Sequence, residues 1–407
     1  MMKLSDRLLS LSPSATFAMS AKSAELKAQG IDVINMSVGE PDFDTPEFIK
    51  DAAKESIDRN ITRYSPVPGY ADLKQSICNK LSSENGLDFK PSQIVVSNGA
   101  KQSITNAVMA LVNPGDEVII PAPFWVSYPQ MVKLAGGVPV HVTAGIENDF
   151  KITPEQLESA ITPRTRLLIL CSPCNPTGSV YSHEELEALA EVLLRHEDVL
   201  VISDEIYEHL NYIGSHASLA SVPGMKERTV LVNGVSKAYA MTGWRIGFIA
   251  APEWIAKGCS LLQGQYTSGP CSISQKAAQA AWDGDQTCVE TMRQAFERRR
   301  DLIVRLAREI PGLEVNVPQG AFYLFPKCSG CFGKTVCPST DGADSWASRV
   351  IENSTDFAMF LLEDAHVATV GGDAFGGPEC FRMSFALSDK LIEEAMHRIR
   401  NSVAKLR

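Results

Sequence analysis

Short runs of aliphatic and β-branched residues alternate with longer stretches of helical periodicity through the middle of this chain. Runs that are almost wholly apolar are typical of strands buried on both faces of a sheet. Connections long enough to contain a helix separate most of them, which favours parallel neighbours. The pattern predicts an α/β fold whose large domain has a mainly parallel, helix-covered sheet of seven strands. The predicted strands are residues 94–97, 117–120, 138–142, 167–170, 199–202, 230–232 and 246–250.

Start signals predict helices between these strands. Ser182 stands three residues before Glu185, the spacing of a capping box, and leucines and alanines then recur at helical spacing to Leu194. Thr153 followed by Pro154 predicts a second helix start.

The alternation of apolar runs and helical stretches ends at about residue 310. Pro311-Gly312 ends a long basic helix, and the run 320–325 predicts a strand. We expect a smaller α+β domain formed by residues 1–47 and 311–407, beside a large domain of residues 48–310. The boundary between them is expected in the helix-rich stretch 253–309 or at its end.

Composition narrows the class of protein. The chain has 407 residues, 44% of them hydrophobic, which is enough for the cores of two domains. Lys and Arg number 38 against 48 Asp and Glu, and the net charge of -10 argues against a nucleic-acid partner. The longest apolar stretches fall far short of the roughly 20 residues that cross a bilayer, and no signal peptide is recognisable at the start. We expect a cytosolic protein without membrane contact.

Ten cysteines are scattered over the chain and are expected to be reduced thiols. Two spacings allow a metal-binding interpretation, namely the C-x-x-C of Cys171 and Cys174, and the group Cys328, Cys331 and Cys337. A buried thiol at a strand end more often packs as a small apolar group, and the second group lacks an obvious fourth ligand. We therefore predict no metal site.

Lys237 lies between two predicted strands, in a weakly charged segment. A single lysine in such a place is usually a solvated loop residue. Here Ser236 precedes it, Arg245 follows eight residues later, and nearby glycines let the backbone approach an anion closely. A lysine that forms a Schiff base needs such a phosphate anchor beside it.

Three other strand ends carry polar groups. Gly99 and Ala100 start a helix after a strand, which makes either an anion site or an ordinary turn. Asp204 follows a buried strand, where it could pair with a protonated pyridine nitrogen and Tyr207 could reach an oxygen on the same ring; alternatively, Asp204 caps a helix and Tyr207 packs. Asn175, held between turn residues, either faces the ring or belongs to a simple turn.

Together these segments resemble one family, the fold-type I pyridoxal-phosphate aminotransferases of class I/II, and within it the prokaryotic-type aspartate aminotransferases. The matching motifs cover nearly the whole chain in order. They are Pro13-Ser-Ala-Thr, Gly39-Glu-Pro-Asp-Phe-Asp-Thr-Pro, Tyr64-Ser-Pro-Val-Pro-Gly, Gly99-Ala-Lys-Gln, Phe124-Trp-Val-Ser-Tyr-Pro, Asn175-Pro-Thr-Gly, Ser203-Asp-Glu-Ile-Tyr-Glu-His, Ser236-Lys-Ala-Tyr-Ala-Met-Thr-Gly-Trp-Arg-Ile-Gly, Gly320-Ala-Phe-Tyr and Phe381-Arg-Met-Ser.

The resemblance implies a pyridoxal 5'-phosphate cofactor and a role for each matching residue. Lys237 would form the Schiff base and move the substrate proton. Asp204 would pair with the pyridinium nitrogen, Tyr207 and Asn175 would bind the ring's 3-oxygen, and Trp125 would stack on the ring. The residues implied to bind the phosphate are Gly99, Ala100, Ser236 and Arg245, with Lys101 beside them.

The resemblance also implies substrates and a partner. Arg382 would bind the substrate α-carboxylate as a planar fork, helped by Asn175 and Gly39, while Trp125 lines the same site. Lys101 would meet the distal carboxylate of a dicarboxylic substrate, or else solvate a helix start. Tyr64 would reach the phosphate of the neighbouring subunit, so a homodimer with shared active sites is expected. The implied reaction moves the amino group of L-aspartate to 2-oxoglutarate by a ping-pong mechanism.

Some features depart from the family or leave its reaction open. Relatives that accept prephenate often carry a basic residue where this chain has Ser12, which argues against prephenate. The segment 328–347 is longer than in many relatives. A β-eliminating lyase on the same cofactor, or a non-catalytic regulatory protein with the same fold, remains an alternative because fold alone does not determine the reaction.

Overall fold

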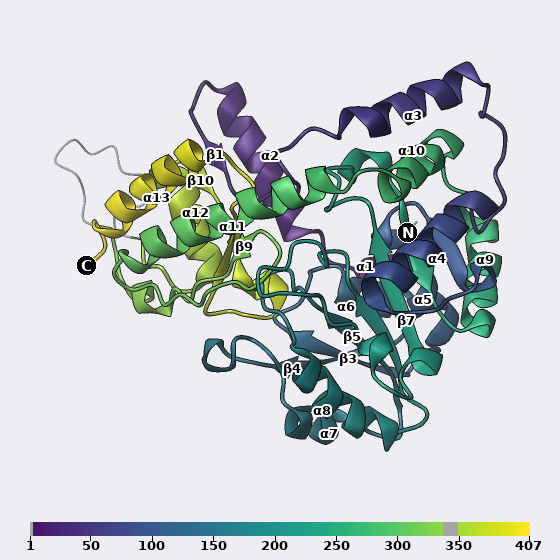
Figure 1. The fold of residues 1–407 in the computed structure, drawn as a ribbon. Coiled ribbons are helices and arrows are strands. Elements are labelled where there is room, and N and C mark those ends of the chain that lie inside the picture. Colours follow the sequence, from purple (N-terminus) through teal and green to yellow (C-terminus); the bar gives the residue numbers. More distant parts are fainter. Residues whose placement is uncertain (1–2, 337–348) are drawn as a thin grey trace.

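A computed structural model describes residues 3–336 and 349–407 (Figure 1). Residues 337–347 of the segment 328–347 lie outside these ranges, so the part of the metal-binding interpretation that depends on Cys337 does so too.

The large sheet has seven strands in the order β2-β8-β7-β6-β5-β3-β4. All neighbours are parallel except β8, which runs antiparallel to β2 and to β7. Each predicted strand is present within a few residues of its expected bounds, and the mainly parallel α/β fold is confirmed. The strands are β2 Ile94–Ser97, β3 Glu117–Ala122, β4 Val138–Thr143, β5 Thr165–Cys171, β6 Leu200–Asp204, β7 Thr229–Gly234 and β8 Gly247–Ala250.

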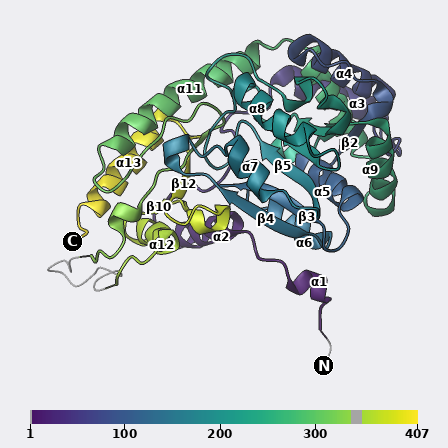
Figure 2. The same cartoon turned by 90° about the horizontal axis from the view of Figure 1, so that it is seen from below.

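Helices cover both faces of this sheet because its strands are apolar on both faces (Figures 1 and 2). Side chains of β3 alternate between two cores: Val118 packs with Ile104 of α5, whereas Ile119 packs with Leu189 of α8. No helix in the described ranges has the length and apolarity needed to cross a membrane. The α-helices between residues 6 and 283 are α1 Asp6–Leu9, α2 Ala15–Ala28, α3 Glu47–Asp58, α4 Ala71–Asn85, α5 Ala100–Leu111, α6 Tyr128–Leu134, α7 Pro154–Ala160, α8 His183–Leu194, α9 Glu253–Tyr266 and α10 Ser272–Asp283.

Both predicted helix starts are capping boxes. The backbone N–H of Glu185 donates to Ser182 Oγ at 3.2 Å, and the N–H of Ser182 donates to Glu185 Oε2 at 2.8 Å. Thr153 and Gln156 form the same reciprocal pair, with Pro154 in the first turn of the helix. Each box satisfies two backbone donors that a helix end would otherwise leave without partners.

A further apolar core lies among the C-terminal elements. It is built around Phe322, Phe357 and Phe381 and includes residues of α11. The N-terminal segment joins this region because β1 pairs with β10 and α2 packs on α12; Figure 2 shows α2 beside α12. The elements are β1 Ile34–Asn35, α11 Thr287–Arg308, β9 Tyr323–Leu324, α12 Ser354–Asp364, β10 Val367–Ala368, β11 Val370–Gly371, β12 Phe381–Ser384 and α13 Asp389–Val403.

The strand predicted at 320–325 is only two residues long, Tyr323–Leu324. Ala321 has a positive φ of 56°, and its N–H donates to the carbonyl of Leu210 at 2.7 Å. A left-handed residue interrupts the extended backbone, so the strand begins later than the apolar pattern suggests.

Candidate active site

A cavity of about 710 Å³ lies where the carboxyl ends of β5 and β6 meet the start of α5 and the small three-stranded sheet. Ligands of α/β proteins collect at such strand ends. Most of the residues singled out from the sequence line this one cavity. They are Gly39, Ala100, Lys101, Trp125, Asn175, Asp204, Tyr207, Ser236, Lys237, Arg245 and Arg382.

Lys237 follows β7 and lines the cavity. Its Nζ donates to the carbonyl of Gly39 at 2.6 Å. Burial lowers the pKa of Lys237 to about 8, with Arg382 and Arg245 acting in the same direction and Glu40 opposing them. The amine is thus far closer to neutrality at physiological pH than an exposed lysine, as a nucleophile requires.

Asp204 ends β6 and is 3% exposed. Its Oδ2 accepts a hydrogen bond from Tyr128 Oη at 2.5 Å, and its Oδ1 accepts the N–H of Ile206 at 3.3 Å. Burial raises the pKa of Asp204 to about 6, and the bond from Tyr128 counteracts this rise. The residues that follow Asp204 form a turn rather than a helix, so its carboxylate does not cap a helix.

The start of α5 forms the positive end of the cavity. Gly99 has a φ of 82°, and a side chain there would collide with the Arg245 guanidinium. Gly247 of β8 leaves room for the N–H of Ala100 in the same way. Arg245 donates only to backbone carbonyls, those of Asn98 and Thr242, so no carboxylate of the described chain neutralises it. A helix start beside such an arginine is suited to a phosphate group.

Arg382 of β12 is 2% exposed and faces the cavity from the opposite side. Its guanidinium donates to Asn175 Oδ1 at 2.9 Å and to the carbonyl of Ser37 at 2.6 Å. The guanidinium carbon lies 4.6 Å from the Tyr323 ring centroid, and Nε has no hydrogen-bond partner. Buried donors are rarely left unpaired, so this arginine is arranged to receive a further acceptor.

Lys101 and Trp125 meet at the rim of the cavity. Lys101 Nζ lies 4.9 Å from the Trp125 ring centroid and 6.0 Å from that of Phe17. Burial lowers the pKa of Lys101, and the neighbouring Arg245 adds to this effect. Tyr64 is placed differently from all these residues because it is 99% exposed and does not line the cavity.

Two tyrosines at the site had been assigned no role from the sequence. Tyr323 Oη lies 2.7 Å from Tyr207 Oη, and a side chain at Gly39 would collide with it. Tyr128 contacts Asp204 as described above. Both belong to the motifs quoted for the family, but only the folded chain reveals which groups their hydroxyls meet.

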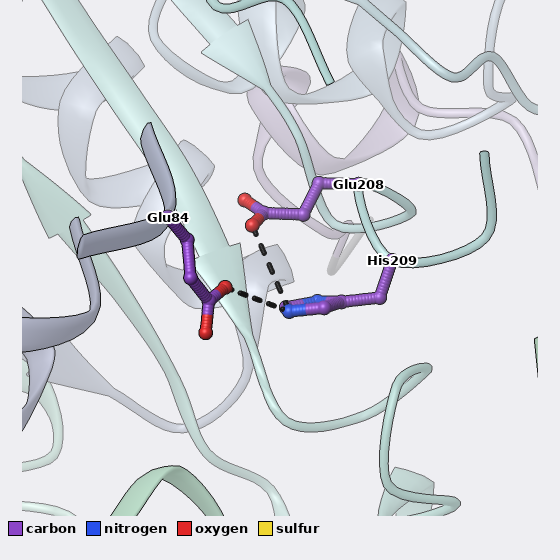
Figure 3. A group of neighbouring side chains, drawn as sticks. All are labelled: Glu84, Glu208 and His209. Carbon is purple, nitrogen blue, oxygen red and sulfur yellow. Dashed lines mark hydrogen bonds and ion pairs between the residues drawn. The ribbon is translucent and has the colours of Figure 1, made fainter. Parts of the chain in front are cut away.

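A cluster of charged side chains lies next to the segment that carries Asp204 and Tyr207. His209 Nε2 is 3.0 Å from Glu84 Oε2 and 3.8 Å from Glu208 Oε1 (Figure 3). Lys80 forms a buried ion pair with Glu208. Burial alone would raise the pKa of Glu208, but Lys80 and His209 outweigh it and hold the pKa at about 2. The cluster has the residue types of a metal site, but a lysine already supplies the compensating charge, and we interpret it as an anchor for this segment.

The cysteines in the described ranges are free thiols. Burial raises the pKa of Cys328 and Cys331. In the ranges that the structure describes, the groups of three possible metal ligands contain only Glu and His, and no cysteine belongs to them.

These residues fit pyridoxal phosphate. The cavity joins a phosphate-sized positive end, formed by the start of α5, Ser236 and Arg245, to a buried carboxylate, Asp204, that suits a protonated ring nitrogen. A desolvated amine, Lys237, lines the same cavity. The arrangement defines an enzyme that acts on amino groups with the help of this cofactor.

Comparison with known proteins agrees with this class. The family described as "Aminotransferase class I and II" matches residues 31–399. The chain is 51% identical to an aspartate/prephenate aminotransferase of Cereibacter sphaeroides, over 99% of both chains. It is 48% identical to an aspartate aminotransferase of Geobacillus stearothermophilus, over 98% of both chains.

Solved structures give the same result. The aspartate aminotransferase of Rhizobium meliloti superposes with a TM-score of 0.94 at 44% identity, over 100% of both chains. The Thermus thermophilus aspartate aminotransferase with maleate gives a TM-score of 0.90 at 40% identity, over 99% of this chain and 100% of that one. The chain belongs to the class I and II aminotransferases, and it is a pyridoxal-phosphate-dependent transaminase. The predicted family, cofactor and reaction type are confirmed, and the lyase and regulatory alternatives fall away.

Proposed function

We propose that this enzyme transfers the amino group of L-aspartate to 2-oxoglutarate in two half-reactions at one site. The observation that carries the choice of a dicarboxylic substrate is the pair of cations in one cavity, Arg382 with an unpaired Nε and Lys101 at the rim. The similar proteins named aspartate aminotransferases support the same choice, as does the similar Thermus thermophilus structure with maleate, a dicarboxylate.

In this proposal Gly99, Ala100, Ser236 and Arg245 would hold the phosphate of the cofactor, and Trp125 would pack on its ring. Pyridoxal phosphate supplies, when bound, an aldehyde that condenses with amines and a ring that withdraws electrons from the substrate α-carbon.

The remaining cofactor contacts are made by side chains at the ends of β5 and β6. Asp204 would pair as an anion with the ring nitrogen, and Asn175 and Tyr207 would bind the 3-oxygen. The hydroxyl of Tyr323 is 2.7 Å from that of Tyr207, which limits the directions in which Tyr207 can point.

Lys237 acts as nucleophile and proton carrier. A pKa lowered to about 8 makes its Nζ able to accept a proton in one step and return it in another near neutral pH. The bond from Nζ to the Gly39 carbonyl holds the amine in the cavity between these steps.

Arg382 binds the substrate α-carboxylate and thereby orients the Cα–H bond towards Lys237. The guanidinium is already fixed by Asn175 and the Ser37 carbonyl, so binding need not order it. Lys101 binds the distal carboxylate, and its reduced hydration beside Trp125 strengthens that contact.

We propose that the enzyme is a homodimer and that Tyr64 completes the site of the partner subunit. Tyr64 is fully exposed, and near it the apolar side chains of Leu261 and Tyr266 on α9 are 69% and 66% exposed. The residues that follow Tyr64 pack against the segment just after α9. A side chain at Gly269 in that segment would collide with Ser65 and Pro66. An exposed aromatic surface of this kind is typical of subunit interfaces.

Subunit mixing tests the shared site. A Lys237→Ala subunit and a Tyr64→Ala subunit are each expected to be inactive at limiting pyridoxal phosphate. Their hybrid dimer would regain one intact site only if Tyr64 acts across the interface. A mixture that stays inactive after proven exchange of subunits would reject the shared site.

We also propose the division into a large domain of residues 48–310 and a small domain of residues 1–47 and 311–407. The helix α11 is the connection between them, since Val289 packs in a core of the large sheet and Phe296 in the C-terminal core. Limited proteolysis with mass mapping would test the proposed boundary.

The experiment that tests the function is a set of half-reaction spectra with single amino acids. Aspartate and glutamate are expected to convert the bound cofactor into pyridoxamine phosphate faster than aromatic or aliphatic donors. Lys237→Ala is expected to fold and dimerise but to lose turnover. Near-normal turnover in that variant, or a faster reaction with apolar donors, would contradict the proposal.

A further inference from the structure

Tyr128 is a buried tyrosine whose hydroxyl meets the acid of the active site. It is the first residue of α6 and is 1% exposed. Its Oη lies 2.5 Å from Asp204 Oδ2, a short distance that is typical of a hydroxyl donating to a carboxylate. The other carboxylate oxygen accepts the N–H of Ile206, so the plane of the Asp204 carboxylate is held from two sides.

The phenol can act only as a donor towards Asp204. Burial raises the pKa of Tyr128 well above its ordinary value, and the neighbouring Asp204 charge adds to this rise. The proton therefore stays on the tyrosine while the bond to the carboxylate persists. The Cys171 thiol also adjoins this hydroxyl, because Cys171 pairs with Asp204 across β5 and β6.

The Tyr128 ring also packs against Trp125, an aromatic side chain that lines the cavity. The two rings stand edge-on, with centroids 5.4 Å apart and an angle of 86°. The two residues are three positions apart in the chain. One short segment therefore both contacts Asp204, through Tyr128, and lines the cavity, through Trp125.

The environment of Asp204 makes this donor important. Burial favours the protonated carboxyl, and the charge of Glu205 acts in the same direction. The bonds from Tyr128 and Ile206 and the charge of Lys237 favour the anion instead. If the Tyr128 donor is removed, the carboxylate becomes a stronger base and competes better for a proton shared with a facing ring nitrogen.

We propose that Tyr128 is a positioning residue that orients Asp204 and keeps its carboxylate anionic, so that the shared proton stays on the ring nitrogen of the cofactor. This inference rests on the proposed function and adds a residue to it. The Tyr128 phenol keeps its proton and donates a hydrogen bond throughout. The proton whose location Tyr128 controls is a different one, which Asp204 and the ring nitrogen share.

The experiment uses the holoenzyme reconstituted with pyridoxal phosphate labelled with ¹⁵N in the ring. The ¹⁵N chemical shift reports directly whether the ring nitrogen carries a proton. For Tyr128→Phe we expect a shift towards the unprotonated value, together with a fall in kcat for aspartate of about 10- to 100-fold, the loss of a hydrogen bond to a charged group. The KM for aspartate should change little because the hydroxyl of Tyr128 bonds to Asp204, whereas the substrate carboxylates are assigned to Arg382 and Lys101.

Two comparisons separate this role from packing. Tyr181→Phe is the matched control, because Tyr181 is also a buried tyrosine near Cys171, but its hydroxyl accepts the N–H of Ile152 instead of contacting Asp204. This control should leave the ¹⁵N shift unchanged. Replacing Tyr128 with 3-fluorotyrosine keeps the ring and provides a stronger donor, so the ring nitrogen should remain protonated.

The outcomes are distinguishable. A wild-type ¹⁵N shift in Tyr128→Phe would overturn the role of Tyr128 while leaving the transaminase assignment intact. Equal shifts in the Tyr128→Phe and Tyr181→Phe variants would also overturn it, because general loosening of the core would then be the cause. A wild-type enzyme that neither binds the labelled cofactor nor transaminates would instead reject the proposed function.

Discussion

The lowered pKa of Lys237 leads to a quantitative prediction about uptake of the cofactor. The aldehyde of pyridoxal phosphate reacts only with a neutral amine, so incorporation into the cofactor-free protein should follow the neutral fraction of Lys237. Burial holds this pKa at about 8 instead of the ordinary 10.5. Because the folded protein disfavours the protonated form, the rate should rise with pH and reach half its maximum near pH 8.

The size of the effect follows from the same two values. At pH 7 an amine with a pKa of about 8 is neutral in about one molecule in ten, whereas an ordinary lysine is neutral in about one in 3,000. The protein should therefore react about 300-fold faster at pH 7 than an exposed amine of equal nucleophilicity. The charge of Glu40 raises the pKa of Lys237, so Glu40→Gln should move the midpoint to lower pH.

The assay is stopped-flow mixing of cofactor-free protein with pyridoxal phosphate between pH 6 and 10, followed by absorbance. Nα-acetyl-lysine measured in parallel corrects for ionisation of the cofactor itself. A rate that still rises steeply at pH 10 without levelling off, or a Glu40→Gln midpoint displaced to higher pH, would refute the argument that burial controls this amine.

Four further substitutions test other parts of the site. Arg382→Lys keeps a charge but loses the planar fork, so kcat/KM for aspartate should fall by about 10²- to 10³-fold in steady-state kinetics. Gly99→Ala should weaken cofactor binding at least about 10-fold in equilibrium titrations, since the new Cβ would strike the Arg245 guanidinium. Gln263→Leu removes hydrogen bonds to Ser97 and to backbone carbonyls from a fully buried position and should cost about 2 to 4 kcal/mol in urea unfolding. Wild-type enzyme should use prephenate poorly, and Ser12→Arg should raise that activity if the missing basic residue is the cause. Unchanged values in any of these assays would contradict the corresponding contact.

Some parts of the site could be predicted because they depend on local pattern. Asp204 is the last residue of the apolar strand β6, Asn175 follows the end of β5 by a few residues, and parallel strands bring such ends to one edge of the sheet. Other parts could not be predicted because they depend on which groups meet in space. The bond of Arg382 to Asn175, the pairing of Tyr207 with Tyr323, and the contact of Tyr128 with Asp204 join residues 76 to 207 positions apart.

The sequence by itself determined the seven strands of the large sheet, two helix starts, the family, and the set of polar residues at strand ends. Hydrophobic periodicity, capping spacing and ordered motifs are properties of neighbouring residues, so they can be read without coordinates. Only the tertiary structure decided the protonation tendencies of Lys237 and Asp204. Their pKa values depend on how completely water is excluded and on which charged residues, distant in the sequence, lie nearby in space. Both conditions arise only when the large sheet and the C-terminal elements pack around the cavity.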